Sequence, residues 1–243
     1  MKKKILLLVV PGIVLFAVLI GLAVTGYEIG WGPFSGLFKG WESEVKAIET
    51  RYDAETRQEE IVFYGASNFR LWKEMENDLA PYPVQNHGFG GCTDHDLMTY
   101  ADRILYPYNP KIVFFQTGSN DYVNLSGTED EKVEKCMRYK KEMFASFHEH
   151  LPDAKFVVMS GLLLPGRSNY REMTQIINSQ LRSLCEEYDY MFFVNAEKMT
   201  FDGTNYYTEL FISDQIHLNH DGQMIWAEKY IKPILQNLWE DSQ

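Results

Sequence analysis

Five short apolar runs, each separated from the next by a longer stretch with helical spacing, constrain the fold of this chain more than any other feature. Strands joined through helices need crossover connections, so neighbouring strands run parallel and helices cover both faces of the sheet. We predict an α/β fold, a three-layer α/β/α sandwich around a mostly parallel five-stranded sheet. The predicted strands are residues 61–64, 84–86, 111–116, 155–160 and 191–194, and the predicted helices are residues 70–79, 94–104, 129–150, 169–188 and 221–238.

The N-terminus predicts a membrane span that precedes this fold. Three lysines at positions 2–4 come before an uncharged run from Ile5 to Val24. At 1.5 Å per residue this run is about 30 Å long, enough to cross a bilayer as one transmembrane helix. The lysines predict a cytoplasmic N-terminus and an extracellular catalytic domain. The alternative is a cleaved signal peptide and secretion of the mature protein.

Residues 26–58 are predicted to connect this anchor (residues 1–25) to the folded domain (residues 59–243). The first part, to Gly40, is rich in glycine and aromatic residues, as is typical of a juxtamembrane linker. From Trp41 to about residue 60 the chain is charged, and Val45, Ile48 and Tyr52 recur at helical spacing. This pattern predicts an amphipathic lead-in helix.

Charge and cysteine content exclude several classes of function. The formal net charge of -11 argues against nucleic-acid binding, which needs clustered Lys and Arg to neutralise phosphates. The three cysteines, Cys92, Cys136 and Cys185, contain no C-x-x-C pair, which disfavours a thiolate zinc site. One disulfide among them is possible outside the cell, and the sequence does not place it.

The carboxyl ends of the strands are where a fold of this kind binds ligands. Ser67, in Gly65-Ala66-Ser67, follows the first predicted strand and precedes a helix, where backbone N–H groups favour developing negative charge. The alternative is that Ser67 only caps that helix.

Two further loops follow predicted strands. Gly88–Gly91, after the second strand, is a glycine-rich loop that lets the backbone approach a ligand closely, although a tight turn or a phosphate cradle has the same composition. Asn120, after the third strand, can point a side-chain N–H at an oxyanion. The alternative is that Asn120 only forms an Asx turn at the end of the strand.

Asp214 precedes His217 by three residues, just before the last predicted helix. A carboxylate at this spacing can bond one ring nitrogen, fix the tautomer and stabilise the imidazolium. A serine hydroxyl is a weak nucleophile at neutral pH and needs such a base.

Taken in order, Gly65–Ser67, Gly91, Gly118-x-Asn120 and Asp214-x-x-His217 resemble the four sequence blocks of the SGNH/GDSL-type serine esterases and acylhydrolases. The resemblance covers the chain from about Trp41 to the last predicted helix. It is closest to a bacterial branch with a Gly-Phe-Gly-Gly loop, here residues 88–91. It implies the flavodoxin-like fold of that family.

The resemblance also implies a role for each matching residue. Ser67 is the expected nucleophile, His217 the general base and then general acid, and Asp214 the residue that orients His217. The backbone N–H groups of Ser67 and Gly91 and the amide of Asn120 are the expected oxyanion hole. No metal and no organic cofactor is implied.

Three positions depart from the family's usual pattern. Ala66 lacks the usual aspartate, although many members of the close branch have serine there. His87 stands where arginine is common, and Cys92 replaces serine or aspartate. We place His87 and Arg167 in the substrate pocket, with an exposed loop arginine as the alternative for Arg167.

The predicted function is serine-dependent ester hydrolysis outside the cell, removing short acyl groups such as acetyl from carbohydrate or other small esters. The predicted partners are an ester substrate and, through the N-terminal helix, a membrane. The alternatives are a lysophospholipase or other lipid-ester or thioester hydrolase, and a catalytically silent glycan-binding surface protein. A nucleotide or phosphate binder is disfavoured because the G-x-x-x-x-G-K-[ST] pattern is missing.

Overall fold

The computed structural model describes residues 40–117 and 119–240, and the chain divides into two units, residues 1–47 and 48–243. The predicted membrane anchor and the linker up to residue 39 lie outside the described residues. No helix among the described residues has the length and apolar character needed to cross a membrane.

The predicted lead-in helix is α2 (Glu42–Arg51), which is shorter than expected. It ends at Arg51 because the Asp53 carboxylate accepts a hydrogen bond from the N–H of Glu55, and the chain turns there instead of continuing as helix. Ile48 and Tyr52, two of the apolar positions that predicted this helix, are buried.

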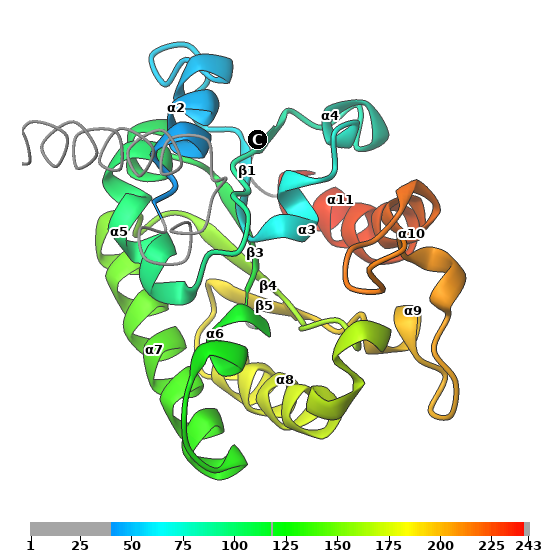
Figure 1. Cartoon of the computed structure of the whole chain (residues 1–243). Coiled ribbons are helices and arrows are strands. Elements are labelled where there is room, and N and C mark those ends of the chain that lie inside the picture. The colour runs from blue at the N-terminus through cyan, green and yellow to red at the C-terminus, as the bar shows by residue number, and fades with distance from the viewer. Residues whose placement is uncertain (1–39, 118, 241–243) are drawn as a thin grey trace, which may run out of the picture. The chain divides into compact units, whose positions relative to one another are not determined.

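A five-stranded parallel sheet forms the centre of the second unit (Figure 1), in the order β2-β1-β3-β4-β5. All five strands were predicted, and their ends differ from the prediction by at most one residue. They are β1 (Ile61–Gly65), β2 (Val84–Asn86), β3 (Ile112–Gln116), β4 (Lys155–Met159) and β5 (Met191–Val194).

The strands are apolar throughout because both faces of the sheet are covered. Phe63 of β1 stacks on Phe114 of β3 at a centroid distance of 4.5 Å, within the core on one face. Tyr64, the next residue, points to the other face and contacts Phe147, 5.9 Å away. Consecutive apolar residues therefore fill two separate cores.

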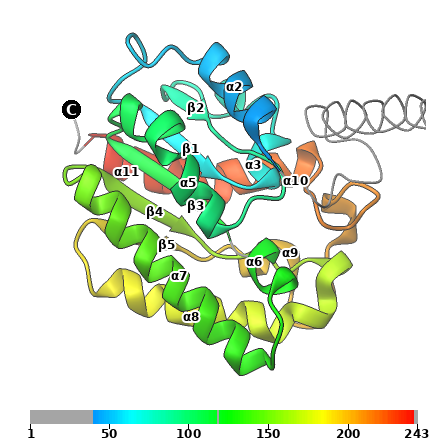
Figure 2. The ribbon, with the colours of Figure 1, turned by 60° about the vertical axis from the view of Figure 1, so that its left-hand side comes forward.

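Helices on both faces complete the three layers (Figure 2). Helices α3, α4, α10 and α11 pack on the Phe63 face, and α5, α7 and α8 on the Tyr64 face. Their bounds are α3 (Ser67–Arg70), α4 (Met75–Asp78), α5 (Asp94–Ile104), α7 (Glu129–His150), α8 (Arg171–Glu186), α10 (His220–Trp226) and α11 (Lys232–Glu240). Two short helices were not predicted, α6 (Ser119–Asn124) and α9 (Glu197–Thr200), and three-residue to six-residue 3₁₀ turns lie at Tyr106–Tyr108, Pro165–Tyr170 and Thr208–Leu210.

Two predicted helices are each divided into shorter segments. The one predicted at residues 70–79 is α3 followed by α4, because the Trp72 side chain turns into the core and its Nε1 donates to Asp78 at 2.7 Å. The last predicted helix contains a π-helical segment, Ala227–Ile231, between α10 and α11. A π-turn shifts the side chains that follow it relative to a straight helix.

Gly65, the last residue of β1, has no room for a side chain. A Cβ there would lie 2.5 Å from the backbone oxygen of Gln116 on β3. We expect Gly65→Ala to lower the free energy of unfolding by about 1–3 kcal/mol, because the neighbouring strand must shift. Urea unfolding measures the change. Ser183→Ala, on the exposed side of α8, is the control and should stay within about 0.5 kcal/mol of the parent; an equally small effect at Gly65 would contradict the prediction.

Candidate active site

Ser67 is the first residue of α3, directly after β1. Ala66 occupies the cap position of this helix, and no side chain caps it, so the alternative that Ser67 serves only as a cap is wrong. The Ser67 hydroxyl instead lies 2.7 Å from Nε2 of His217, a residue 150 positions along the chain. A serine within hydrogen-bond distance of an imidazole has the geometry of an activated nucleophile.

The other ring nitrogen of His217 lies 2.6 Å from Asp214 Oδ2. The second Asp214 oxygen accepts the backbone N–H groups of Ile216 and His217 at 2.9 and 3.0 Å. This loop places Gln215 in the left-handed region, with φ of 58°. Burial tends to raise the pKa of Asp214, but the hydrogen bonds from the His217 ring and the two N–H groups outweigh it and hold the pKa below its usual value. The carboxylate is therefore ionised when it faces the imidazole.

Two contacts fix the histidine loop, one to the serine loop and one to the 3₁₀ turn that follows β4. The side-chain oxygen of Asn68, a buried residue, accepts the N–H of Leu218 at 3.1 Å. The N–H of Gly166 donates to Gln215 O at 2.8 Å, and a Cβ on Gly166 would lie 2.8 Å from Asp214 O. Sequence reasoning missed Asn68; its only signal is that it adjoins the serine.

Asn120 lies in α6, and its amide orientation is set from both sides. Its Nδ2 donates to Cys92 O at 3.0 Å, and its Oδ1 accepts from the Arg167 guanidinium at 3.4 Å. These partners differ from those of an Asx turn. One Nδ2 hydrogen is used by Cys92, which leaves the second for a ligand. Gly118, the first residue of the same block, lies outside the described residues.

The glycine loop, residues 88–91, packs against α3. A Cβ on Gly88 would lie 2.5 Å from the backbone N of Arg70, so only glycine fits there. Gly91 has a φ of 74°, in the left-handed region that favours glycine. No hydrogen bond joins the Gly91 N–H to another residue in the described part of the chain. Ser67, as the first residue of α3, likewise has no intrahelical acceptor for its N–H.

Arg167 lies in the 3₁₀ turn after β4, and its side chain reaches the loop that carries Asn120. Its guanidinium donates to the Ser119 hydroxyl and to Asn120 Oδ1. The side chain is half-buried, so the alternative of a freely exposed loop arginine is wrong. The Cys92 thiol, next to Gly91, lies 3.5 Å from Gly65 O, and the turn that carries Arg167 bonds the histidine loop through Gly166. The structure thus brings together the five loops that carry Ser67, Asp214 and His217, Gly91, Asn120 and Arg167.

The sequence of residues 59–225 matches the GDSL-like lipase/acylhydrolase family. The chain belongs to this family. Its members are ester hydrolases, so the predictions of an SGNH/GDSL-type protein and of an ester hydrolase are confirmed.

Solved structures of the same fold are similar to this acylhydrolase over most of its length. A GDSL-like lipase from Bacteroides thetaiotaomicron is 17% identical with a TM-score of 0.62, covering 81% of this chain and 98% of its own. A candidate platelet activating factor from Streptococcus pneumoniae is 18% identical with a TM-score of 0.64, covering 84% and 94%. An acetyl-xylooligosaccharide esterase from Geobacillus is 15% identical with a TM-score of 0.56, covering 74% and 94%. No curated protein matches the sequence.

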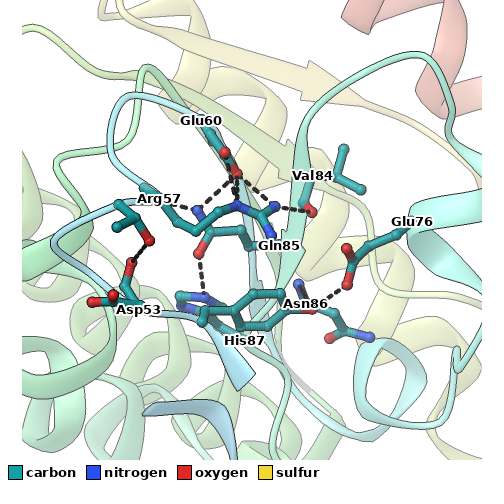
Figure 3. Close-up of polar contacts among 10 residues, drawn as sticks. Asp53, Arg57, Glu60, Glu76, Val84, Gln85, Asn86 and His87 are labelled. Carbon is teal, nitrogen blue, oxygen red and sulfur yellow. Dashed lines mark hydrogen bonds and ion pairs between the residues drawn. The ribbon is translucent and has the colours of Figure 1, made fainter. Parts of the chain in front are cut away.

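His87 does not belong to the substrate pocket of this acylhydrolase, which corrects the prediction. Its side chain is fully buried, and Nδ1 lies 2.6 Å from Ile104 O. Nε2 lies 3.1 Å from Gln85 Oε1 (Figure 3). The two-residue alternation of β2 turns positions 85 and 87 to the same side, and His87 packs between the rings of Tyr52 and Tyr108. Burial lowers the pKa of His87 to about 3.

Polar contacts fasten the edge strand β2, from which the glycine loop leaves (Figure 3). The Gln85 amide donates to Arg57 O at 2.7 Å and to Glu60 at 3.0 Å, while the Arg57 guanidinium pairs with Glu60. Next to them, the Asn86 amide donates to Phe69 O at 2.6 Å. These bonds hold β2 against both its neighbour and α3, and so fix the start of the glycine loop.

Asp214→Asn tests the assignment of the histidine partner. The asparagine keeps the backbone contacts of the loop but turns an NH₂ toward His217, which favours the wrong tautomer. We expect the turnover number to fall by about 10⁴-fold. Steady-state hydrolysis of p-nitrophenyl acetate measures it. Asp221→Asn, an exposed aspartate in the first turn of α10, is the matched control, and comparable activity in both variants would refute the role of Asp214.

Proposed function

We propose that this protein hydrolyses esters through Ser67, His217 and Asp214, with an oxyanion hole formed by Ser67, Gly91 and Asn120. The observation that carries the proposal is the continuous hydrogen-bonded series from Ser67 Oγ to His217 Nε2, at 2.7 Å, and from His217 Nδ1 to Asp214, at 2.6 Å. Nucleophile, base and orienting carboxylate in this relation form the arrangement used for acyl transfer on several unrelated folds.

In the first step, Ser67 Oγ bonds to the ester carbonyl carbon as its proton passes to His217 Nε2. The carbonyl oxygen becomes an oxyanion, which the two backbone N–H groups and the free Asn120 hydrogen stabilise. Ionised Asp214 stabilises the imidazolium that forms. The carbon–oxygen bond to the alcohol then breaks, and the alcohol leaves with the proton from His217.

In the second step, water attacks the acyl-enzyme. His217 takes a proton from the water, a second oxyanion forms in the same place, and its collapse returns the proton to Ser67. The products are the free acid and the regenerated serine. Every proton transfer uses Nε2, which is why the hydrogen bond at Nδ1 must hold the ring in one orientation.

The proposed substrate carries a short acyl group, such as acetyl, on a carbohydrate or another small alcohol. The acetyl-xylooligosaccharide esterase shares this fold and supports the acetyl group, and a GDSL-like lipase that also shares it supports a lipid ester as the second candidate. Comparing acetate with laurate esters of p-nitrophenol separates the two. Membrane anchoring and an extracellular domain also remain proposals, based on residues 5–24, and protease accessibility in intact cells tests them.

A fluorophosphonate probe tests the nucleophile before any substrate is known. We expect the full chain to be labelled on Ser67, because the probe reacts with serines activated by a neighbouring base. Ser67→Ala and His217→Ala should abolish labelling, and Ser183→Ala should not. Intact-mass and peptide mass spectrometry locate the adduct. A folded parent chain that is not labelled would favour the alternative of a silent glycan-binding protein.

Asn120→Ala tests the oxyanion hole. Removing one such donor typically lowers turnover by about 10²–10³-fold, with little change in KM, because the bond forms mainly in the transition state. Hydrolysis of p-nitrophenyl acetate provides both constants. Asn237→Ala on the exposed side of α11 is the control. A turnover within twofold of the parent would remove Asn120 from the oxyanion hole.

A further inference from the structure

Lys140, in the middle of α7, is a charged side chain buried beneath the candidate active site. Only 1% of its side chain is exposed, and its ammonium lies 2.9 and 3.1 Å from the two carboxylate oxygens of Asp94. The ammonium also donates to the Thr117 hydroxyl at 2.6 Å. All three hydrogens of the ammonium are therefore used inside the protein.

Asp121 joins this cluster through the backbone. One of its carboxylate oxygens accepts the N–H of Asp94 at 2.9 Å. The other oxygen is buried and has no hydrogen-bond partner among the described residues. The cluster of Asp94, Thr117, Asp121 and Lys140 thus holds one cation and two carboxyl groups in a largely buried place, where Asp121 is 5% exposed and Thr117 is half-buried.

The other three members of this cluster each lie within three residues of a part of the proposed oxyanion hole. Asp94 lies two residues after Cys92, whose carbonyl accepts the Asn120 amide, and three residues after Gly91. Asp121 directly follows Asn120 in α6, and Thr117 follows the last residue of β3. Lys140 comes from a helix that carries no residue of the site. It therefore connects the glycine loop and the Asn120 loop from behind.

A buried ion pair is a poor means of stabilising a fold. Removing two charges from water costs several kcal/mol per ion, and an apolar pair of similar size is often as stable. Such a pair does impose one geometry, because displacing either partner leaves a buried charge unpaired.

We propose that Lys140, Asp94 and Asp121 are positioning residues that set the distance between the Gly91 and Asn120 oxyanion donors. A further part of this proposal is that ionisation of Asp121 weakens the stabilisation of the oxyanion by the oxyanion hole. Both parts rest on the proposed function of the site. The cluster touches no reacting atom, so its effect reaches the substrate only through Asn120 and the glycine loop.

The charge of the cluster depends on pH. Burial, together with the neighbouring Asp94 carboxylate, raises the pKa of Asp121 to about 7, although Lys140 opposes this rise. The Cys136 thiol of α7 and the phenol of Tyr122, the next residue in α6, also lie near Asp121. Below about pH 7 the protonated cluster is neutral. Above it, Asp121 adds a negative charge behind the place where the oxyanion develops.

Asp121→Asn tests the pH dependence, because asparagine keeps an oxygen for the Asp94 N–H but cannot ionise. We expect the turnover number of the parent for p-nitrophenyl acetate, divided by that of the variant, to fall on the order of tenfold between pH 6 and 9, the effect of one buried charge near the oxyanion. The division cancels the pH dependence of the general-base steps, which both chains share. The variant should keep the KM of the parent, and a ratio that stays constant over this range would overturn this part of the proposal.

A second readout needs no catalysis. The ¹⁵N signal of the Asn120 side-chain amide is assigned by its loss in Asn120→Ala. In the parent, its chemical shift should change with pH at the same midpoint as the ionisation of the Asp121 carboxyl. In Asp121→Asn it should not change. This titration tests whether Asp121 and the Asn120 amide are coupled, even if the chain hydrolyses no ester. A parent that is inactive and unlabelled, but in which the amide titrates, would refute the proposed function and retain the coupling.

Lys140→Met tests the ion pair itself, and Lys140→Met/Asp94→Asn removes the charge that the single variant leaves unpaired. We expect the double variant to recover stability but to keep a turnover at least tenfold below the parent with an unchanged KM. Phe147→Leu, two turns further along α7, is the control for a loss of core packing and should keep the parent turnover. Parent-like turnover in the double variant would show that Lys140 does not position the hole.

Discussion

The parallel pairing of β1 with both β2 and β3 is the constraint on which the rest of the site depends. It brings three loops to one edge of the sheet, and the hydrogen-bond ladder continues into them. The N–H of Ala66 donates to Gln116 O at 3.1 Å, and the N–H of Phe89 donates to Gly65 O at 3.0 Å. The serine and glycine loops therefore begin with the rigidity of strands. Groups that must meet an oxyanion within a few tenths of an ångström need such a support.

The histidine reaches this edge from the opposite end of the chain, through packing of the last helices. Trp226 of α10 lies over Phe69 and Trp72, with centroid distances of 5.5 and 6.1 Å, and all three rings are fully buried. These aromatic contacts set α10 against the segment that carries Ser67. The bond from Leu218 to Asn68 then aligns the preceding residue, His217, with the serine. Hydrophobic packing brings the histidine loop close to Ser67, and one hydrogen bond sets the orientation of His217.

Much of this arrangement can be predicted from sequence because its signals are local. Runs such as Ile112–Gln116 are apolar on both faces and read as buried parallel strands. Asp214 and His217 are three residues apart, so their contact needs only one loop. The prediction that His87 lines the substrate pocket was wrong because its side chain packs between Tyr52 and Tyr108. Both tyrosines are distant from His87 in sequence, so no local pattern indicates this contact. The Lys140 ion pair joins residues 46 positions apart, and nothing near either residue indicates it.

The charged groups around the site fall into two kinds: Asp214, which faces the histidine, and the buried Asp94–Lys140 pair, which contacts no reacting atom. Asp214 keeps 39% of its side chain exposed, and backbone N–H groups rather than burial hold it in place. Exposure costs little here, because its carboxylate needs only to be ionised and aimed at one nitrogen. The proposed oxyanion donors, by contrast, are neutral amides whose effect depends on their placement before the reaction begins. In the proposed arrangement an ion pair lies beneath them, where the side chain of Asp94 is 0% exposed, and fixes their position without putting a competing charge in contact with the substrate. On this proposal the chain uses its surface for proton transfer and its interior to fix the geometry.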